Sequence, residues 1–225
     1  PKDLIFSILM LCVSAVAAVM WWQSAASGLE ALSFITGAAC VWLTVKENAW
    51  NFPISLLNVS TFCFVFFQSR LFADASLQVV YFILTLVGWY LWLYGGTHRT
   101  ALRVARASRH ESSLVLLSVA AMTLLFWSTL RYIGGSASFW DALTTAICLG
   151  AQWLLNRKRL ENWILWIVAD CIYVPLYLYK QLYLTSLLYA VFLVMAGIGL
   201  AQWRATWRRQ GRASDETPVP QEAAA

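Results

Sequence analysis

The sequence predicts an all-α integral membrane protein with about eight transmembrane helices. The 225 residues are 60% hydrophobic and only 12% charged, far less charge than a soluble domain of this length needs on its surface. The apolar residues also gather in blocks of about 17 to 22, the length at which a helix crosses roughly 30 Å of hydrocarbon. The predicted helices cover residues 4–22, 29–45, 50–67, 75–94, 114–130, 139–155, 162–179 and 182–203.

The first block, residues 4–22, has the length of a signal peptide as well as that of a membrane helix. It lacks a clear cleavage site, and residues 114–130 form its counterpart later in the chain, so we interpret it as a helix. Because the chain begins at Pro1 without a Met, we expect native residues to precede it. At the other end, residues 206–225 are polar and contain Pro218 and Pro220, which predicts a disordered tail.

Thirteen of the sixteen Lys and Arg residues fall at the N-terminus, in the even-numbered loops or in the C-terminal tail. They are Lys2, Lys46, Arg99, Arg103, Arg106, Arg109, Arg157, Lys158, Arg159, Arg204, Arg208, Arg209 and Arg212. Only Arg70, Arg131 and Lys180 fall on the other side of an eight-span chain. The positive-inside rule therefore predicts that both termini are cytoplasmic. Since topology explains the net charge of +5, nothing supports binding to nucleic acid.

The second half of the chain repeats the first at one constant shift, without gaps. The residues that match are Trp42 with Trp153, Asn51 with Asn162, Leu71 with Leu182, Gly88 with Gly199, and Trp92 with Trp203. An even number of helices per repeat makes the two copies parallel, related by an axis near the membrane normal. Such a design predicts a binding site between the halves, near the middle of the bilayer.

Asp170 is the acidic residue that lies deepest in a predicted helix, and it follows Trp163 and Trp166 at a spacing of i, i+3, i+7. The three residues therefore form one stripe. Intramembrane carboxylates usually mark a transport pathway, although a protonated Asp that ties helices together is the structural alternative. Aromatic faces with a countercharge suit a flat, positively charged ring that bears hydroxyl groups.

In the first half, Asn58 lies at a similar depth, and Gln78 and Tyr81 share one face of the fourth helix. No Lys or Arg lies deep in any predicted helix, which favours a substrate without phosphate. Walker A, HExxH and GxSxG motifs are absent, so the sequence predicts neither an enzyme, a cofactor nor a metal site.

Two groups of motifs resemble the PnuC family of bacterial vitamin transporters, over roughly residues 28–205. The first group comprises Asn51-Phe-Pro53, Asn58, Gln78 to Tyr81 and Gly88-Trp-Tyr-Leu-Trp92. The second comprises Trp163, Trp166, Asp170, Pro175-Leu-Tyr177 and Tyr189. The resemblance implies two three-helix bundles, residues 28–97 and 138–205, joined by a loop and linker helix at 98–137. That arrangement is similar to SWEET sugar transporters, with residues 1–27 as an additional N-terminal helix.

The resemblance also implies facilitated diffusion of nicotinamide riboside across the bacterial inner membrane, for NAD synthesis. The substrate-binding residues would be Asn58, Gln78, Tyr81, Trp163, Trp166, Asp170, Tyr177 and Tyr189. Asn51, Asn162, Gly88 and Gly199 would serve gating or helix packing. Several alternatives stay open: a thiamine carrier, a membrane enzyme that uses Asp170, and a sensory or scaffold protein. The sequence does not decide whether the chain forms a homo-oligomer.

Overall fold

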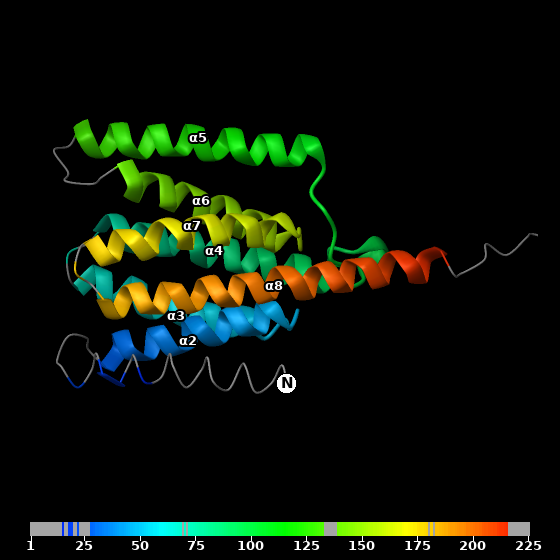
Figure 1. Cartoon of the computed structure of the whole chain (residues 1–225), viewed down its shortest axis with the longest axis horizontal. Helices are drawn as coiled ribbons and strands as arrows, with labels where there is room; N and C mark the ends of the chain where they lie inside the picture. The colour runs from blue at the N-terminus through cyan, green and yellow to red at the C-terminus, as the bar shows by residue number, and fades with distance from the viewer. Residues whose placement is uncertain are drawn as a thin grey trace, which may run out of the picture.

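The computed structural model describes residues 28–68, 72–132, 139–179 and 183–215, together with Ala15, Ala18, Val19, Trp22, Arg70 and Gln181. These residues form seven α-helices and one short 3-10 helix, and no strand (Figure 1). The elements are α2 (Gly28–Val45), α3 (Asn51–Gln68), α4 (Phe72–Tyr94), η1 (Thr97–Arg99), α5 (Arg109–Tyr132), α6 (Phe139–Asn156), α7 (Glu161–Tyr179) and α8 (Tyr183–Asp215). The helix predicted over residues 4–22 lies outside the described residues apart from four positions.

Five of the described helices are long and apolar enough to cross a membrane. These segments are Asn51–Gln68, Asp74–Tyr94, Arg109–Thr129, Glu161–Tyr179 and Thr185–Arg212, and α2 contains a shorter apolar stretch, Phe34–Val45. The helix α6 is less apolar, because Asp141, Gln152 and Asn156 lie within it. Its burial against neighbouring helices accommodates these polar side chains.

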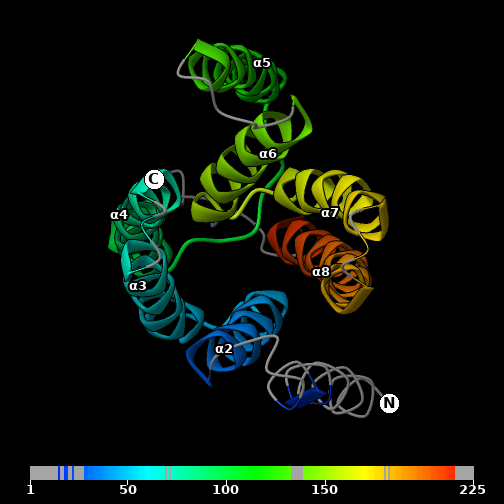
Figure 2. The same cartoon turned by 90° about the vertical axis from the view of Figure 1, so that its left-hand side faces the viewer.

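The helices form two groups of three, with the middle helix of each group packed on both neighbours. In the first group α3 lies between α2 and α4, and in the second α7 lies between α6 and α8. The groups meet where α2 packs on α8 and where α4 packs on α6. Seen along the helices, the six surround a common centre, and α5 lies outside them against α6 (Figure 2).

The sequence repeat recurs in the backbone of the helix ends. Glu47 and Lys158, which the repeat makes equivalent, follow α2 and α6 with positive φ angles of 56° and 50°. Each is the left-handed residue of a Schellman motif, in which the next N–H donates to the carbonyl five residues earlier, at 2.9 Å in both copies. Arg70 and Gln181, also equivalent in the repeat, have φ angles of 60° and 59°. The predicted repeat register is therefore confirmed.

One end of the bundle holds the loops at 46–50, 95–108 and 157–160 and the end of α8, at the right of Figure 1. We call it the basic end, because these segments and the start of α5 carry most of the Lys and Arg residues. The prediction that residues 206–225 are disordered is wrong for 206–215, which continue α8 to Asp215. Arg and Ala there favour a helix, and the first Pro comes only at position 218.

Candidate functional site

A cavity of about 420 Å³ lies between the two groups of helices. The side chains that line it come from α2, α3 and α4 in the first group and from α6, α7 and α8 in the second. Its volume is within the range of roughly 300–1,000 Å³ that is typical of small-molecule sites. Among the described residues that line it, none is Lys or Arg.

The stripe predicted on α7 faces this cavity, since Trp163, Trp166 and Asp170 all line it. The side chain of Asp170 is 5% exposed and makes no hydrogen bond or ion pair with any described residue. A buried carboxylate without a countercharge is costly, so a positively charged ligand in this cavity would stabilise the ionised form of Asp170.

Trp163 is more deeply packed than its place in the stripe suggested. Its ring is 2% exposed and meets Trp203 edge-to-face, with 5.5 Å between ring centroids. Its indole N–H has no hydrogen-bond acceptor among the described residues. A buried donor without a partner costs roughly 1–3 kcal/mol, so an acceptor on a ligand would be stabilising there.

The first group of helices supplies the amide and hydroxyl groups that the sequence predicted. Asn58, Gln78 and Tyr81 all line the cavity. The side-chain N–H of Asn58 donates to the hydroxyl of Thr36 at 2.8 Å, which fixes the orientation of the amide. The structure thus brings polar groups of the first half to the cavity that Asp170 borders.

Three tyrosines pack together beside the cavity, and only two of them line it. Tyr173 and Tyr189 are lining residues, with 4.6 Å between their ring centroids. Tyr177, a predicted binding residue, lies behind them, stacked on Tyr189 at 5.2 Å. Tyr177 also stacks on Tyr173 at 5.7 Å, so any effect of Tyr177 on a ligand would be transmitted through these two lining rings.

The sequence analysis did not single out the face that α6 contributes. Thr145, Cys148 and Gln152 line the cavity with the same i, i+3, i+7 spacing as the stripe on α7. The side-chain N–H of Gln152 donates to Asn156 at 3.0 Å, and Asn156 donates in turn to the carbonyl of Leu84 on α4 at 2.8 Å. This spacing, in a helix that carries several polar residues, was the signal that could have revealed the face.

Residues 27–205 match the family described as "Nicotinamide mononucleotide transporter". The chain belongs to this family. Two curated relatives are named nicotinamide riboside transporter PnuC. The one from Escherichia coli strain K12 is 26% identical over 211 residues, covering 82% of this chain and 88% of the relative. The one from Haemophilus influenzae is 26% identical over 203 residues, covering 88% and 89%.

A solved structure has the same fold as this family member. It is titled "Crystal structure of the Vitamin B3 transporter PnuC" and aligns with a TM-score of 0.71 at 22% identity, covering 91% of this chain and 92% of that one. The family membership and the apolar helices together identify the chain as a multi-pass membrane protein of a transporter family, which gives no support to an enzyme.

Two rings that line the cavity of this family member, those of Phe52 and Trp163, each lie against a glycine of the next helix. A β-carbon at Gly88 would come within 2.8 Å of the ring of Phe52 and closer still to the side chain of Asn156 on α6, and one at Gly199 within 2.6 Å of the ring of Trp163. The repeat relates Phe52 to Trp163, just as it relates the two glycines. Gly88 and Gly199 therefore permit the close approach of α3 to α4 and of α7 to α8.

Asn51 and Asn162, the other two predicted gating or packing residues, tie helix starts to the preceding loops. The amide of Asn51 donates to the carbonyl of Asn48 at 3.0 Å, and that of Asn162 donates to the carbonyl of Arg159. Asn51 also lines the cavity, whereas Asn162 is fully buried and is not among the lining residues. Their contacts support local packing in both halves.

Two tryptophans exchange hydrogen bonds between the halves, in a layer between the cavity and the basic end. Trp92 donates its indole N–H to the carbonyl of Leu155, and Trp203 donates to the carbonyl of Thr44, each at 3.0 Å. The repeat relates the two donors to each other and the two acceptors to each other, so the two bonds are symmetry mates. The two rings also contact each other, with centroids 5.8 Å apart.

An ion pair marks the pseudo-two-fold axis in the same layer. The ammonium of Lys158 lies 3.4 Å from a carboxylate oxygen of Glu47, and these equivalent residues are 111 positions apart in the chain. Equivalent residues can touch only where the axis passes between them. The ammonium also lies 4.5 Å from the ring centroid of Trp92. Burial lowers the pKa of Lys158, and the nearby carboxylate opposes this shift.

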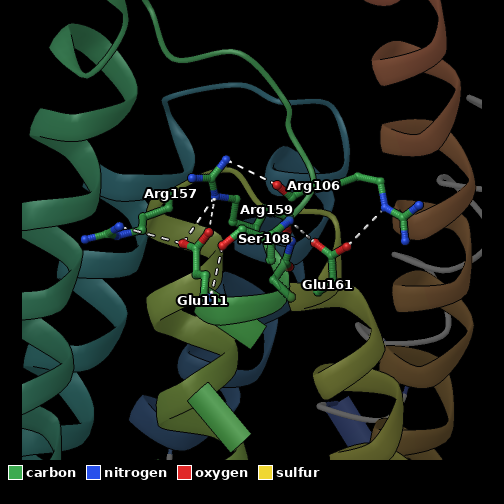
Figure 3. A network of polar contacts seen from close by, with 8 residues as sticks. Arg106, Ser108, Glu111, Arg157, Arg159 and Glu161 are labelled. Carbon is green, nitrogen blue, oxygen red and sulfur yellow. Dashed lines mark hydrogen bonds and ion pairs between the residues drawn. The ribbon is translucent and has the colours of Figure 1, made fainter. Parts of the chain in front are cut away.

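A network of polar contacts ties the start of α5 to the loop between α6 and α7 (Figure 3). Glu111 lies 3.0 Å from Arg159 and 3.7 Å from Arg157. Residues 100–108, which we call the crossover segment, pass alongside that loop. Ala105 donates its N–H to the carbonyl of Lys158 at 3.1 Å, and its own carbonyl accepts the N–H of Leu160 at 2.9 Å. These contacts hold the crossover segment and the start of α5 against the second half of the protein, close to the pseudo-two-fold axis.

Proposed function

We propose that this protein carries nicotinamide riboside across the membrane by facilitated diffusion. The observation that carries the proposal is the cavity between the halves, which an unpaired Asp170 and Trp166 both line from α7. Nicotinamide riboside combines a flat pyridinium ring with the hydroxyl groups of a ribose. The names of the curated relatives point to the same substrate.

The positive ring would be stabilised in two ways. The carboxylate of Asp170 would balance its charge, and the face of Trp166 would add a cation–π attraction of about 0.5–2 kcal/mol. The free indole N–H of Trp163 would donate to an oxygen of the substrate. Asn58, Gln78 and Tyr81 on the opposite wall would bind hydroxyl or amide groups, and Tyr189 would pack on the ligand.

A phosphorylated substrate fits the same cavity poorly. The family description names the mononucleotide, whereas the described lining contains no Lys or Arg to pair with a phosphate. Burying a phosphate beside the uncompensated carboxylate of Asp170 would cost several kcal/mol. We therefore infer that the riboside binds much more tightly than the mononucleotide.

We also infer an architecture of two parallel three-helix bundles, residues 28–97 and 138–205, joined through 98–137 in a SWEET-like arrangement. The exchanged contacts between equivalent residues support two-fold symmetry of these halves. An additional helix within residues 1–27 would complete eight spans. The basic end would then face the cytoplasm of a bacterial inner membrane, with both termini inside.

Transport would proceed by rocking the two halves about their shared axis, with the substrate between them. Trp92, Trp203 and the Glu47–Lys158 pair form a layer of contacts between the halves on the basic-end side of the cavity. Release on that side would require this layer to part. Because the sequence holds no nucleotide-binding loop and no evident proton relay beyond Asp170, the substrate would move only down its gradient.

A thiamine carrier is the second candidate, because thiamine also presents a cationic ring to Asp170. Calorimetric titration of the purified chain with nicotinamide riboside, its mononucleotide and thiamine separates the possibilities. We expect the riboside to bind most tightly and the mononucleotide at least tenfold more weakly. Equal affinity for the mononucleotide would contradict the argument from the missing cations, and tighter binding of thiamine would replace the substrate.

A further inference from the structure

A second, smaller hollow of about 200 Å³ opens at the basic end, away from the substrate cavity. It lies between the start of α7, the last turns of α8 and the crossover segment. Arg106, Arg204 and Arg208 line it together with Trp207, and Ile164 and Leu200 provide apolar wall on the α7 and α8 sides. Separate parts of the chain thus bring guanidinium groups to one small space.

The positive charge in this pocket is only partly balanced. Its single acidic residue, Glu161, is 3.4 Å from the guanidinium of Arg106 and also accepts the backbone N–H of Ala107 at 2.7 Å. Figure 3 shows Glu161 engaged in this way. Arg204 and Arg208 make no ion pair or hydrogen bond with the described residues. The pocket therefore keeps an excess of two positive charges, one helical turn apart on α8.

In a membrane, the length of α8 would bring this pocket near the depth where hydrocarbon gives way to headgroups. The 33 residues of α8 span about 50 Å at 1.5 Å per residue, so the helix must leave a hydrocarbon layer of roughly 30 Å well before Asp215. Leu200 precedes Arg204 by one turn of α8. Ile164, which lines the same pocket from α7, is 46% exposed. Trp207 has the amphipathic ring that favours the membrane interface. Along α8 the apolar Leu200 is therefore followed by Arg204, Trp207 and Arg208, so the pocket joins an apolar wall to guanidinium and indole groups.

We propose that this pocket binds the headgroup phosphate of an anionic phospholipid in the leaflet at the basic end. Guanidinium groups pair with phosphate through charge-assisted, bidentate hydrogen bonds, and basic pockets between membrane helices suit such headgroups. An acyl chain would leave the pocket along Ile164 and Leu200. A lipid bound there would hold α8 against the crossover segment, on the second half of the protein. The inference depends on membrane placement and not on the transported substrate.

The test compares two double variants of the full chain that remove equal charge from the same helix. Arg204→Gln with Arg208→Gln empties the pocket of its free guanidinium groups. Arg209→Gln with Arg212→Gln is the matched control, because these arginines are exposed and do not line the pocket. Retention of phosphatidylglycerol is measured by native mass spectrometry, with phosphatidylcholine as the zwitterionic reference and glycerol phosphate as the soluble phosphate.

We expect wild type and the control to retain phosphatidylglycerol about tenfold or more better than the pocket variant. Phosphatidylcholine should distinguish none of the three proteins. Equal retention by the two double variants would overturn the proposal, because general basic charge would then suffice. If glycerol phosphate competes at the concentration of the lipid itself, the ligand is a soluble phosphate and the lipid assignment is wrong. The unfolding midpoint in plain detergent, expected to be equal for both variants, checks that each is folded.

Discussion

Replacing Gly199 by Ala should destabilise the protein, although Ala is the better helix former. The new β-carbon would lie 2.6 Å from two carbons of the Trp163 ring, where contacts between carbons normally measure about 3.5–4.0 Å. The helices α7 and α8 would have to separate by roughly 1 Å to restore a normal contact. The ring of Trp163 cannot move aside easily, because it is 2% exposed and packs against Trp203.

The expected magnitude follows from two opposing effects. Overpacking a tight contact costs about 1–3 kcal/mol, and exchanging Gly for Ala in a helix recovers at most about 1 kcal/mol. The net loss in the free energy of unfolding should be about 1–2 kcal/mol. Gly197 on the same helix provides the control, because a β-carbon there would meet nothing within 4 Å. Gly197→Ala should be neutral or stabilise by up to about 1 kcal/mol.

Denaturant unfolding in one detergent, followed by tryptophan fluorescence, measures both variants against wild type. Binding of nicotinamide riboside should fall in Gly199→Ala, because a displaced Trp163 changes the cavity wall, and should persist in Gly197→Ala. If the two variants unfold at the same midpoint, the close approach of α7 and α8 is not a constraint and the role assigned to Gly199 is wrong.

Three further predictions concern binding and transport. Asp170→Asn should weaken binding of the riboside by about 1–3 kcal/mol in calorimetry, whereas Asp74→Asn at the exposed start of α4 should not; unchanged affinity in a folded Asp170→Asn protein would refute the site. Glu47→Gln should destabilise the protein by about 1–3 kcal/mol by leaving Lys158 unpaired, and exchanging the two charges should restore thermal stability; an exchange as unstable as the single variant would show that the pair is not at a symmetric position. Proteoliposomes should equilibrate the riboside and stop, so accumulation driven by a pH or sodium gradient would disprove uniport.

Much of the fold was predictable because the relevant signals are local or periodic. Hydrophobic blocks of membrane length predicted every described α-helix to within a few residues, except at the start of α5 and the end of α8. The start of α5 is earlier than predicted because the hydroxyl of Ser108 accepts the N–H of Glu111 at 3.1 Å and caps the helix. The repeat register was predictable because Trp, Asn and Gly residues match between the halves. Matches of this kind arise by chance less often than matches between common apolar residues such as Leu.

The parts that could not be predicted depend on how helices meet. The spacing of Trp163, Trp166 and Asp170 predicted a shared face, but only packing decides that Trp163 is nearly enclosed and that Tyr177 lies behind Tyr189. The lining face of α6 was overlooked because Thr145 and Gln152 resemble ordinary polar residues in a marginal span. The role of each of these side chains in substrate binding stays a prediction.

Trp92 and Trp203 each complete a helix end that belongs to the other half of the protein. The carbonyls of Thr44 and Leu155 lie in the last turn of a helix and already accept the N–H groups of Glu47 and Lys158, at 3.0 and 2.9 Å. Each indole therefore supplies a second donor to a helix-end carbonyl of the other half. A reciprocal contact of this kind is what two identical subunits make in an isologous dimer. We therefore expect a chain of one half to associate with a second copy. If two three-helix halves were joined directly in one chain, the second half would be inverted relative to the first. One additional membrane crossing by α5 would restore the parallel orientation of the two halves.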